Sequence, residues 1–94
     1  MQIYIEFLGL SRLATGQREI ELSVGDGTSF QDIVRILAQR YPALLENIIQ
    51  PTGDVLYEPN IFNVNSQRMI QEHEMNSVPQ SGDHIILMSI SAGG

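Results

Sequence analysis

The feature that most constrains the fold is a single stretch of helical periodicity over residues 30–41. Its apolar side chains recur at the spacing of one helical face: Phe30, Ile33, Val34, Leu37, Ala38 and Tyr41. The other apolar segments are short, and most have the composition of strands. Because one helix covers only one face of a sheet, the sequence predicts a two-layer α+β domain.

Local signals mark both ends of this helix. Ser29 with Asp32, or Thr28 with Gln31, gives the pattern of an N-terminal cap, in which a short polar side chain accepts a hydrogen bond from a free backbone N–H. Pro42 disfavours helical geometry in the residue before it, so we expect the helix to end there.

Two strands are predicted ahead of the helix. Residues 3–8 are apolar at every second position from Ile3, and residues 19–24 alternate between polar and apolar side chains. Residues 11–17, which contain a turn signal at Thr15-Gly16, are predicted as a loop. Because the connection is short, the two strands are expected to pair as an antiparallel hairpin.

Further strands are predicted after the helix. Residues 61–65 read as a short strand, and residues 68–70 as the return limb of a hairpin that turns at Asn65-Ser66. Residues 84–90 form the last predicted strand. Residues 42–60 have no regular pattern beyond a short amphipathic turn.

Composition places the chain among single folded domains. Its 94 residues are 43% apolar and 17% charged, which is typical of one globular domain over residues 1–94. The net charge of −6 argues against nucleic acid and against anionic membrane surfaces as partners. The longest apolar run, Ile85 to Met88, is too short for a bilayer, and residues 1–7 lack a signal-peptide pattern. We therefore expect a soluble cytoplasmic domain.

Two of the residue types that are missing from the sequence limit its covalent chemistry. There is no cysteine, which excludes disulfides, thiolate metal sites and a cysteine nucleophile. All five basic residues are arginine, so the chain has no lysine amine for a Schiff base or for an isopeptide bond. Any covalent chemistry of this chain must therefore use another group.

No catalytic or metal-binding pattern stands out. His73 and His84 are the two histidines, and neither has a ligand at the spacing of a metal motif, so we expect no metal and no bound cofactor. Glu72-His73-Glu74 reads as a solvated turn. Gly25-Asp26-Gly27 lacks the lysine and third glycine of a phosphate loop and also reads as a turn.

The last predicted strand is apolar on both faces. Ile85 and Leu87 lie on one face, and Ile86, Met88 and Ile90 on the other. If the helix covers only one face, the second set forms a partner-binding surface. If residues 42–60 cover the other face, the same side chains are ordinary core residues. The pattern leaves both interpretations open.

The sequence then ends in Ser91-Ala92-Gly93-Gly94, directly after the last strand of a β-β-α-β-β order. With this ending, the chain resembles the ubiquitin-like β-grasp proteins, and among them the sulfur carriers, which include the small subunit of molybdopterin synthase (MoaD) and the thiamine-biosynthesis carrier (ThiS). The resemblance extends over nearly the whole chain. It is carried by the first strand, Gly27-Thr28-Ser29-Phe30, Arg40-Tyr41-Pro42, Asn63-Val64-Asn65, Gly82-Asp83 and Ala92-Gly93-Gly94.

The resemblance implies a four- to five-stranded mixed sheet on one main helix, and a flexible tail over about residues 89–94. It also implies that a ubiquitin-activating-like adenylyltransferase uses ATP to adenylate the Gly94 carboxylate, which sulfur transfer then converts to a thiocarboxylate. A second enzyme, such as the large subunit of molybdopterin synthase, would accept the sulfur. Gly94 would be the reacting residue and Gly93 its required neighbour, with Ala92 and Ser91 as the spacer that enters the partner.

Three functions therefore follow from the sequence. A sulfur carrier for molybdopterin, thiamine, cysteine or tRNA thiolation is the leading hypothesis, and in it the chain is a protein co-substrate, not an enzyme. A ubiquitin-like modifier attached through Gly94 to lysines of other proteins is the alternative. In the third, the domain only binds partners and the two terminal glycines have no chemical role.

Overall fold

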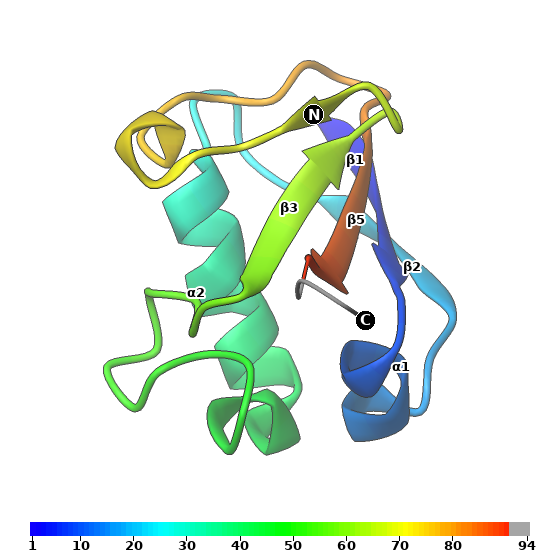
Figure 1. Cartoon of the computed structure of the whole chain (residues 1–94). Coiled ribbons are helices and arrows are strands. Elements are labelled where there is room, and N and C mark those ends of the chain that lie inside the picture. The colour runs from blue at the N-terminus through cyan, green and yellow to red at the C-terminus, as the bar shows by residue number, and fades with distance from the viewer. Residues whose placement is uncertain (91–94) are drawn as a thin grey trace.

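The computed structural model describes residues 1–90, which form a five-stranded sheet with one long helix across one face (Figure 1). The strands lie in the order β2-β1-β5-β3-β4. In chain order the elements are β1 (Gln2–Phe7), α1 (Leu10–Thr15), β2 (Glu19–Ser23), α2 (Phe30–Arg40), the 3-10 turn η1 (Pro42–Leu45), β3 (Asn60–Val64), β4 (Arg68–Met69), the 3-10 turn η2 (Glu72–Glu74) and β5 (His84–Ser89). The predicted α+β class, with one main helix, is confirmed.

The last strand lies in the middle of the sheet. β5 pairs in parallel with β1, which places Ile85 beside Ile5, and antiparallel with β3, which places Leu87 beside Phe62. β1 and β2 form the predicted antiparallel hairpin. The sheet is therefore mixed, and its first and last strands in sequence are neighbours.

The core lies between the sheet and α2. Residues 42–60 contribute Leu44, Ile48 and Ile49 to this core, so this segment packs on the α2 side and not over the opposite face of the sheet (Figure 1). Each fully buried aliphatic side chain stabilises the fold by roughly 1.5–3 kcal/mol. The buried set also includes Ile3, Ile5, Phe7, Leu22, Phe30, Ile33, Val34, Leu37, Ala38, Phe62, Val64, Ile70, Ile85 and Leu87.

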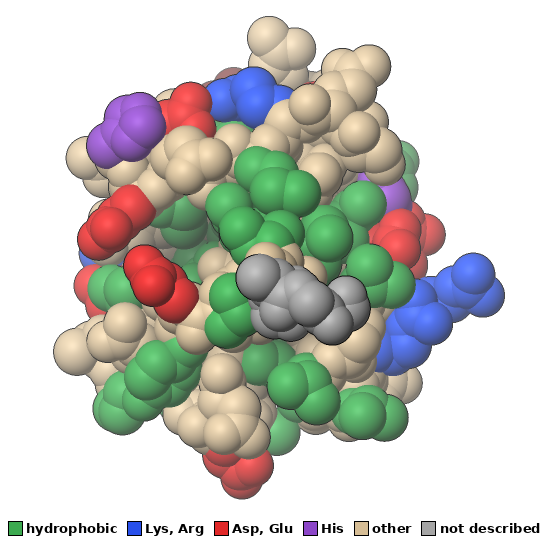
Figure 2. All heavy atoms as spheres, viewed as in Figure 1, with side chains coloured by type: hydrophobic (Ala, Val, Ile, Leu, Met, Phe, Trp, Pro, Cys, Tyr) green, Lys and Arg blue, Asp and Glu red, His purple; other side chains and the backbone are tan. Residues whose placement is uncertain are grey.

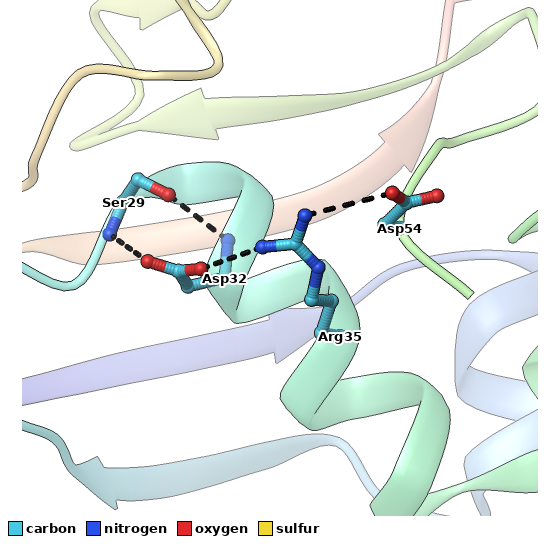
Figure 3. Close-up of polar contacts among 4 residues, drawn as sticks. All are labelled: Ser29, Asp32, Arg35 and Asp54. Atoms are coloured by element: carbon cyan, nitrogen blue, oxygen red, sulfur yellow. Dashed lines mark hydrogen bonds and ion pairs between the residues drawn. The ribbon is translucent and has the colours of Figure 1, made fainter. Parts of the chain in front are cut away.

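α2 begins at a capping box, as one of the two predicted signals indicated (Figure 3). The Ser29 hydroxyl accepts a hydrogen bond from Asp32 N at 3.1 Å, and Asp32 Oδ2 accepts one from Ser29 N at 3.0 Å. Asp32 Oδ1 also pairs with Arg35 Nη1 at 2.7 Å, while Arg35 Nη2 lies 3.6 Å from Asp54. The backbone N–H of Ser29, then its hydroxyl, and Arg35 lower the pKa of Asp32 below its usual 3.8. Within residues 1–90, no helix has the length and apolarity needed to cross a lipid bilayer.

The prediction of a loop over residues 11–17 was wrong. Residues Leu10–Thr15 form the short helix α1, with Gly9 before it and Gly16 after it in the left-handed region at φ 68°. Periodicity could not reveal this helix because only one of its six side chains is buried, and that residue is the polar Ser11.

Ser11 attaches α1 to the end of the central strand. Its hydroxyl donates to the Leu87 carbonyl at 2.9 Å and accepts from Leu8 N at 3.0 Å, with only 2% of the residue exposed. Leu8 N also donates to the Leu87 carbonyl, at 3.2 Å. A buried hydroxyl is stable only with such partners, so these bonds fix the position of α1 on β5.

The β3–β4 hairpin turns at Asn65-Ser66, as predicted. Both residues have positive φ, 56° and 59°, which is the geometry of a tight hairpin turn. Asn65 also joins the turn to the start of β5, because its Oδ1 accepts from His84 N at 2.9 Å and its Nδ2 donates to Asp83 Oδ1 at 3.1 Å.

Removing the Ser11 hydroxyl is expected to destabilise the fold. Ser11→Ala deletes the buried bond to Leu87, so we expect the free energy of unfolding to fall by about 1 kcal/mol in urea denaturation. The matched control is Ser23→Ala, because Ser23 is exposed and bonds only the Gln2 side chain. We expect it to change stability by less than about 0.5 kcal/mol. Equal losses in the two variants would contradict a specific role for the buried bond.

The cap of α2 is expected to make stability depend on pH in the acid range. A group whose pKa is lower in the folded state stabilises the fold above its unfolded pKa, and this contribution is lost as the pH falls through the folded pKa. Asp32→Asn should therefore be less stable than the unaltered chain at neutral pH, and the difference should shrink below pH 3.8. Urea midpoints of both chains across this range measure the effect. A difference that stays constant with pH would show that the carboxylate charge does not contribute.

Candidate functional site

The candidate site begins where β5 ends. Ser89 is the last residue of β5, so the strand extends one residue into the range that was predicted as tail. Ile90 follows, with its N–H donating to the Pro59 carbonyl at 3.1 Å. The predicted site residues Ser91, Ala92, Gly93 and Gly94 lie outside the described residues, so their roles stay predictions.

The predicted partner-binding residues Ile86, Met88 and Ile90 are not part of the core. Ile86 and Met88 are half-buried, and Ile90 is 47% exposed. Their neighbours Ile85 and Leu87 are fully buried on the other face. The interpretation that residues 42–60 bury both faces of the last strand is therefore wrong, because that segment packs with α2.

Cross-strand pairing extends this surface over four strands. Met88 pairs with Ile61, and Ile86 pairs with Asn63, which in turn pairs with Met69. Tyr4 lies on the same face of β1, next to His84. We call Tyr4, Ile61, Met69, Ile86 and Met88 the outer apolar face. Figure 2 shows a group of hydrophobic side chains near the centre of the face in view.

Carboxylates border this face on the side of β1 and β2. Glu6 and Glu19 are cross-strand neighbours, and His84 Nε2 lies 3.2 Å from Glu6 Oε1 and 2.9 Å from Glu19 Oε1. Glu21 lies farther along β2, where it accepts a hydrogen bond from Gln2. A surface with an apolar centre and an acidic border fits a partner with apolar side chains and basic residues at its rim.

A second exposed apolar group was missed by the sequence analysis. Leu8, Leu10 and Leu13 are 40%, 62% and 80% exposed, and all three lie on or directly before α1. The signal in the sequence was three leucines within six residues, of which Leu8 ended the predicted first strand and only Leu13 lay in the segment predicted as loop. The position of these leucines on the molecule follows from the contact between α1 and β5, which joins residues 76 positions apart and cannot be predicted from local sequence.

Of the polar groups singled out in the sequence, the Glu72-His73-Glu74 segment forms a short 3-10 turn. His73 is exposed and lies in η2, between the exposed Glu72 and the half-buried Glu74, which agrees with the predicted turn. Over residues 1–90, no group of three or more His, Asp and Glu side chains is placed to hold a metal ion.

Sequence comparisons find no family. No protein-family model matches the chain, and no curated protein matches it by sequence. Comparison of structures is more informative, because folds persist at identities too low for sequence matching.

Three solved structures match over nearly their whole lengths. SAMP1 from Haloferax volcanii, a small archaeal modifier protein, superposes with a TM-score of 0.80 at 18% identity, covering 100% of both chains. Urm1 from Trypanosoma brucei gives 0.74 at 24% identity, covering 99% of this chain and 95% of Urm1. A candidate molybdopterin converting factor subunit 1 from Pyrococcus furiosus gives 0.72 at 13% identity, covering 94% and 95%.

At these identities the comparison establishes the fold. The TM-scores of 0.72 to 0.80 and the end-to-end coverage agree with the five-stranded sheet and its long helix, so the predicted architecture is confirmed. The chain has the ubiquitin-like β-grasp fold that it shares with SAMP1, Urm1 and the molybdopterin converting factor subunit.

Proposed function

We propose that this chain is a sulfur carrier that acts through the carboxylate of Gly94. The observation that carries the proposal is the position of β5: the central strand of a β-grasp sheet leads directly, through Ile90, into Ser91-Ala92-Gly93-Gly94. Structural neighbours whose names include a modifier and a molybdopterin converting factor support this type of role. The chain would act in the cytoplasm as a co-substrate of its partners.

The proposed reaction has two steps, both in the active site of a ubiquitin-activating-like adenylyltransferase. A Gly94 carboxylate oxygen attacks the α-phosphorus of ATP, which forms an acyl adenylate and releases pyrophosphate. A sulfur nucleophile, for example hydrosulfide, then attacks the carbonyl carbon. The C–S bond forms, the C–O bond to AMP breaks, and a thiocarboxylate remains. This chain supplies the reacting group, and the partner supplies ATP binding and catalysis.

The composition fits this assignment. With no cysteine, the chain has no thiol to carry sulfur as a persulfide, so the carboxylate is the remaining attachment point. Glycine at positions 93 and 94 lacks a Cβ, which allows an extended tail to pass through a narrow channel and to adopt backbone angles closed to other residues.

The outer apolar face would contact the partners in the same model. Ile86 and Met88 lie on β5, the strand that leads to the tail, so a protein that takes up Gly94 comes close to this face. The acidic border formed by Glu6 and Glu19 would pair with basic residues of the partner. A sulfur-accepting enzyme, such as a molybdopterin synthase large subunit, would use the same face after the activating enzyme has left.

A second candidate function is a ubiquitin-like protein modifier. The structural likeness to SAMP1, which is named as a modifier, favours it. The acyl adenylate is common to both functions, and the product differs. In the modifier, a lysine amine of another protein attacks the activated carbonyl and forms an isopeptide bond.

The sulfur-carrier function is tested by measuring the intact mass of the chain after incubation with ATP, sulfide and the ubiquitin-activating-like adenylyltransferase encoded in the same genome. Replacing the terminal –OH by –SH adds about 16 Da. We expect this gain in the unaltered chain and not in a chain that lacks Gly94. If adenylation is shown by ATP–pyrophosphate exchange but the mass stays unchanged, the carrier is contradicted. Isopeptide-linked conjugates in the same mixture would then establish the modifier.

The need for glycine at position 93 is tested by Gly93→Ala. A methyl group in the channel displaces the carboxylate from the α-phosphorus, and a misplacement of about 1 Å costs on the order of 100-fold in rate. We expect ATP–pyrophosphate exchange to fall by that order. Ser23→Ala, a similarly small change at an exposed position of β2 that pairs with the start of β1, is the control and should stay near the unaltered rate. Full exchange with Gly93→Ala would argue against a narrow channel.

A further inference from the structure

Leucines dominate the exposed apolar surface of the described residues. Six large hydrophobic side chains there are exposed, and Leu8, Leu10 and Leu13 make up half of them within six positions. Leu13, at 80%, is the most exposed of all. α1 does not need these side chains for packing, because its buried contact is made by Ser11. Grouped exposed leucines on a small domain indicate a surface that another molecule covers.

The structure fixes this group at one end of the molecule. The Leu87 carbonyl accepts hydrogen bonds from Leu8 N at 3.2 Å and from the Ser11 hydroxyl at 2.9 Å. Arg12 Nε adds a bond to the Phe7 carbonyl at 3.0 Å. α1 therefore sits against the carboxyl end of β5 (Figure 1). Ile90, itself 47% exposed, comes three residues after Leu87, within about 10 Å along an extended chain.

The reach of the tail limits where a partner can lie. Gly94 is four residues beyond Ile90, and four extended residues span at most about 14 Å. An enzyme that holds the Gly94 carboxylate in its active site must therefore come within that distance of Ile90. A standard interface covers about 800 Å² on each partner, which is a round patch of about 16 Å radius. A patch of that size centred on Ile90 includes α1, since Leu87, three residues before Ile90, is in contact with Ser11.

We infer that Leu8, Leu10 and Leu13 form, together with Ile90, a docking surface for the enzyme that adenylates Gly94. We call these four residues the exit surface. The inference rests on the proposed function, and it assigns to that enzyme an apolar surface beside the mouth of its tail channel. The short reach of the tail favours this occupant over a second copy of the chain, since a second copy has no reason to approach Ile90.

The test uses the double variant Leu10→Gln/Leu13→Gln in the full chain. Glutamine has nearly the helix propensity of leucine and both positions are exposed, so α1 should remain intact. The matched control is Val78→Gln. Val78 is 45% exposed and lies with Asn65 and Asp83, at the opposite end of β5 from α1. The readout is ATP–pyrophosphate exchange by the adenylyltransferase as a function of chain concentration.

The double variant should raise the KM for the chain about tenfold or more and leave kcat within about twofold, because the lost contacts act on docking and not on the reacting carboxylate. Leu13→Gln alone should give a smaller rise in the KM for the chain. Val78→Gln should change KM by less than about twofold. Urea denaturation of each variant confirms that the fold is retained.

Each other outcome overturns the inference. If the unaltered chain supports exchange and the leucine variants have the same KM, the exit surface is not a docking surface, while the proposed function stands. If the unaltered chain dimerises in sedimentation and the double variant is a monomer with unchanged KM, a second copy is the occupant. If the unaltered chain supports no exchange, the proposed function fails and the exit surface fails with it.

Discussion

The structure depends on the placement of the last strand in the middle of the sheet. β5 is hydrogen-bonded on both sides, to β1 in parallel and to β3 antiparallel, and its Ile85 and Leu87 are fully buried against α2. Without β5, the β1–β2 hairpin and the β3–β4 hairpin would have no shared partner. Because α2 packs on the face that carries Ile85 and Leu87, Ile86 and Met88 on the other face of β5 stay half-buried. The central position of β5 thus determines both the core and the exposed face of the sheet.

The sequence allowed prediction of the elements that carry their own periodicity. α2 shows a continuous apolar face and a capping box, β1 and β2 show period two, and β5 is a short continuous apolar run, so each could be predicted locally. α1 could not be predicted in this way, because its leucines are exposed to solvent and its one buried residue is Ser11. The partner of Ser11 is a carbonyl 76 residues away, and no local pattern encodes a contact at that separation.

The candidate site was predictable only in part, for a related reason. The apolar character of Ile86 and Met88 is visible in the sequence, but whether residues 42–60 cover them is a question of packing. It is settled by Leu44, Ile48 and Ile49, which join the core on the α2 side. The exit surface was hidden because it combines α1 with the far end of the chain, two segments whose proximity follows only from the pairing of β1 with β5.

The parallel pairing of β1 with β5 also has a consequence for how the protein is made. The first strand completes its hydrogen bonds only when the last one has been synthesised, so the order of translation delays the closure of the sheet to its end. A chain that stops short of β5 lacks the middle of the sheet as well as the residues beyond it. In the proposed role, a chain that stops before β5 therefore lacks both a complete sheet and the glycine that reacts.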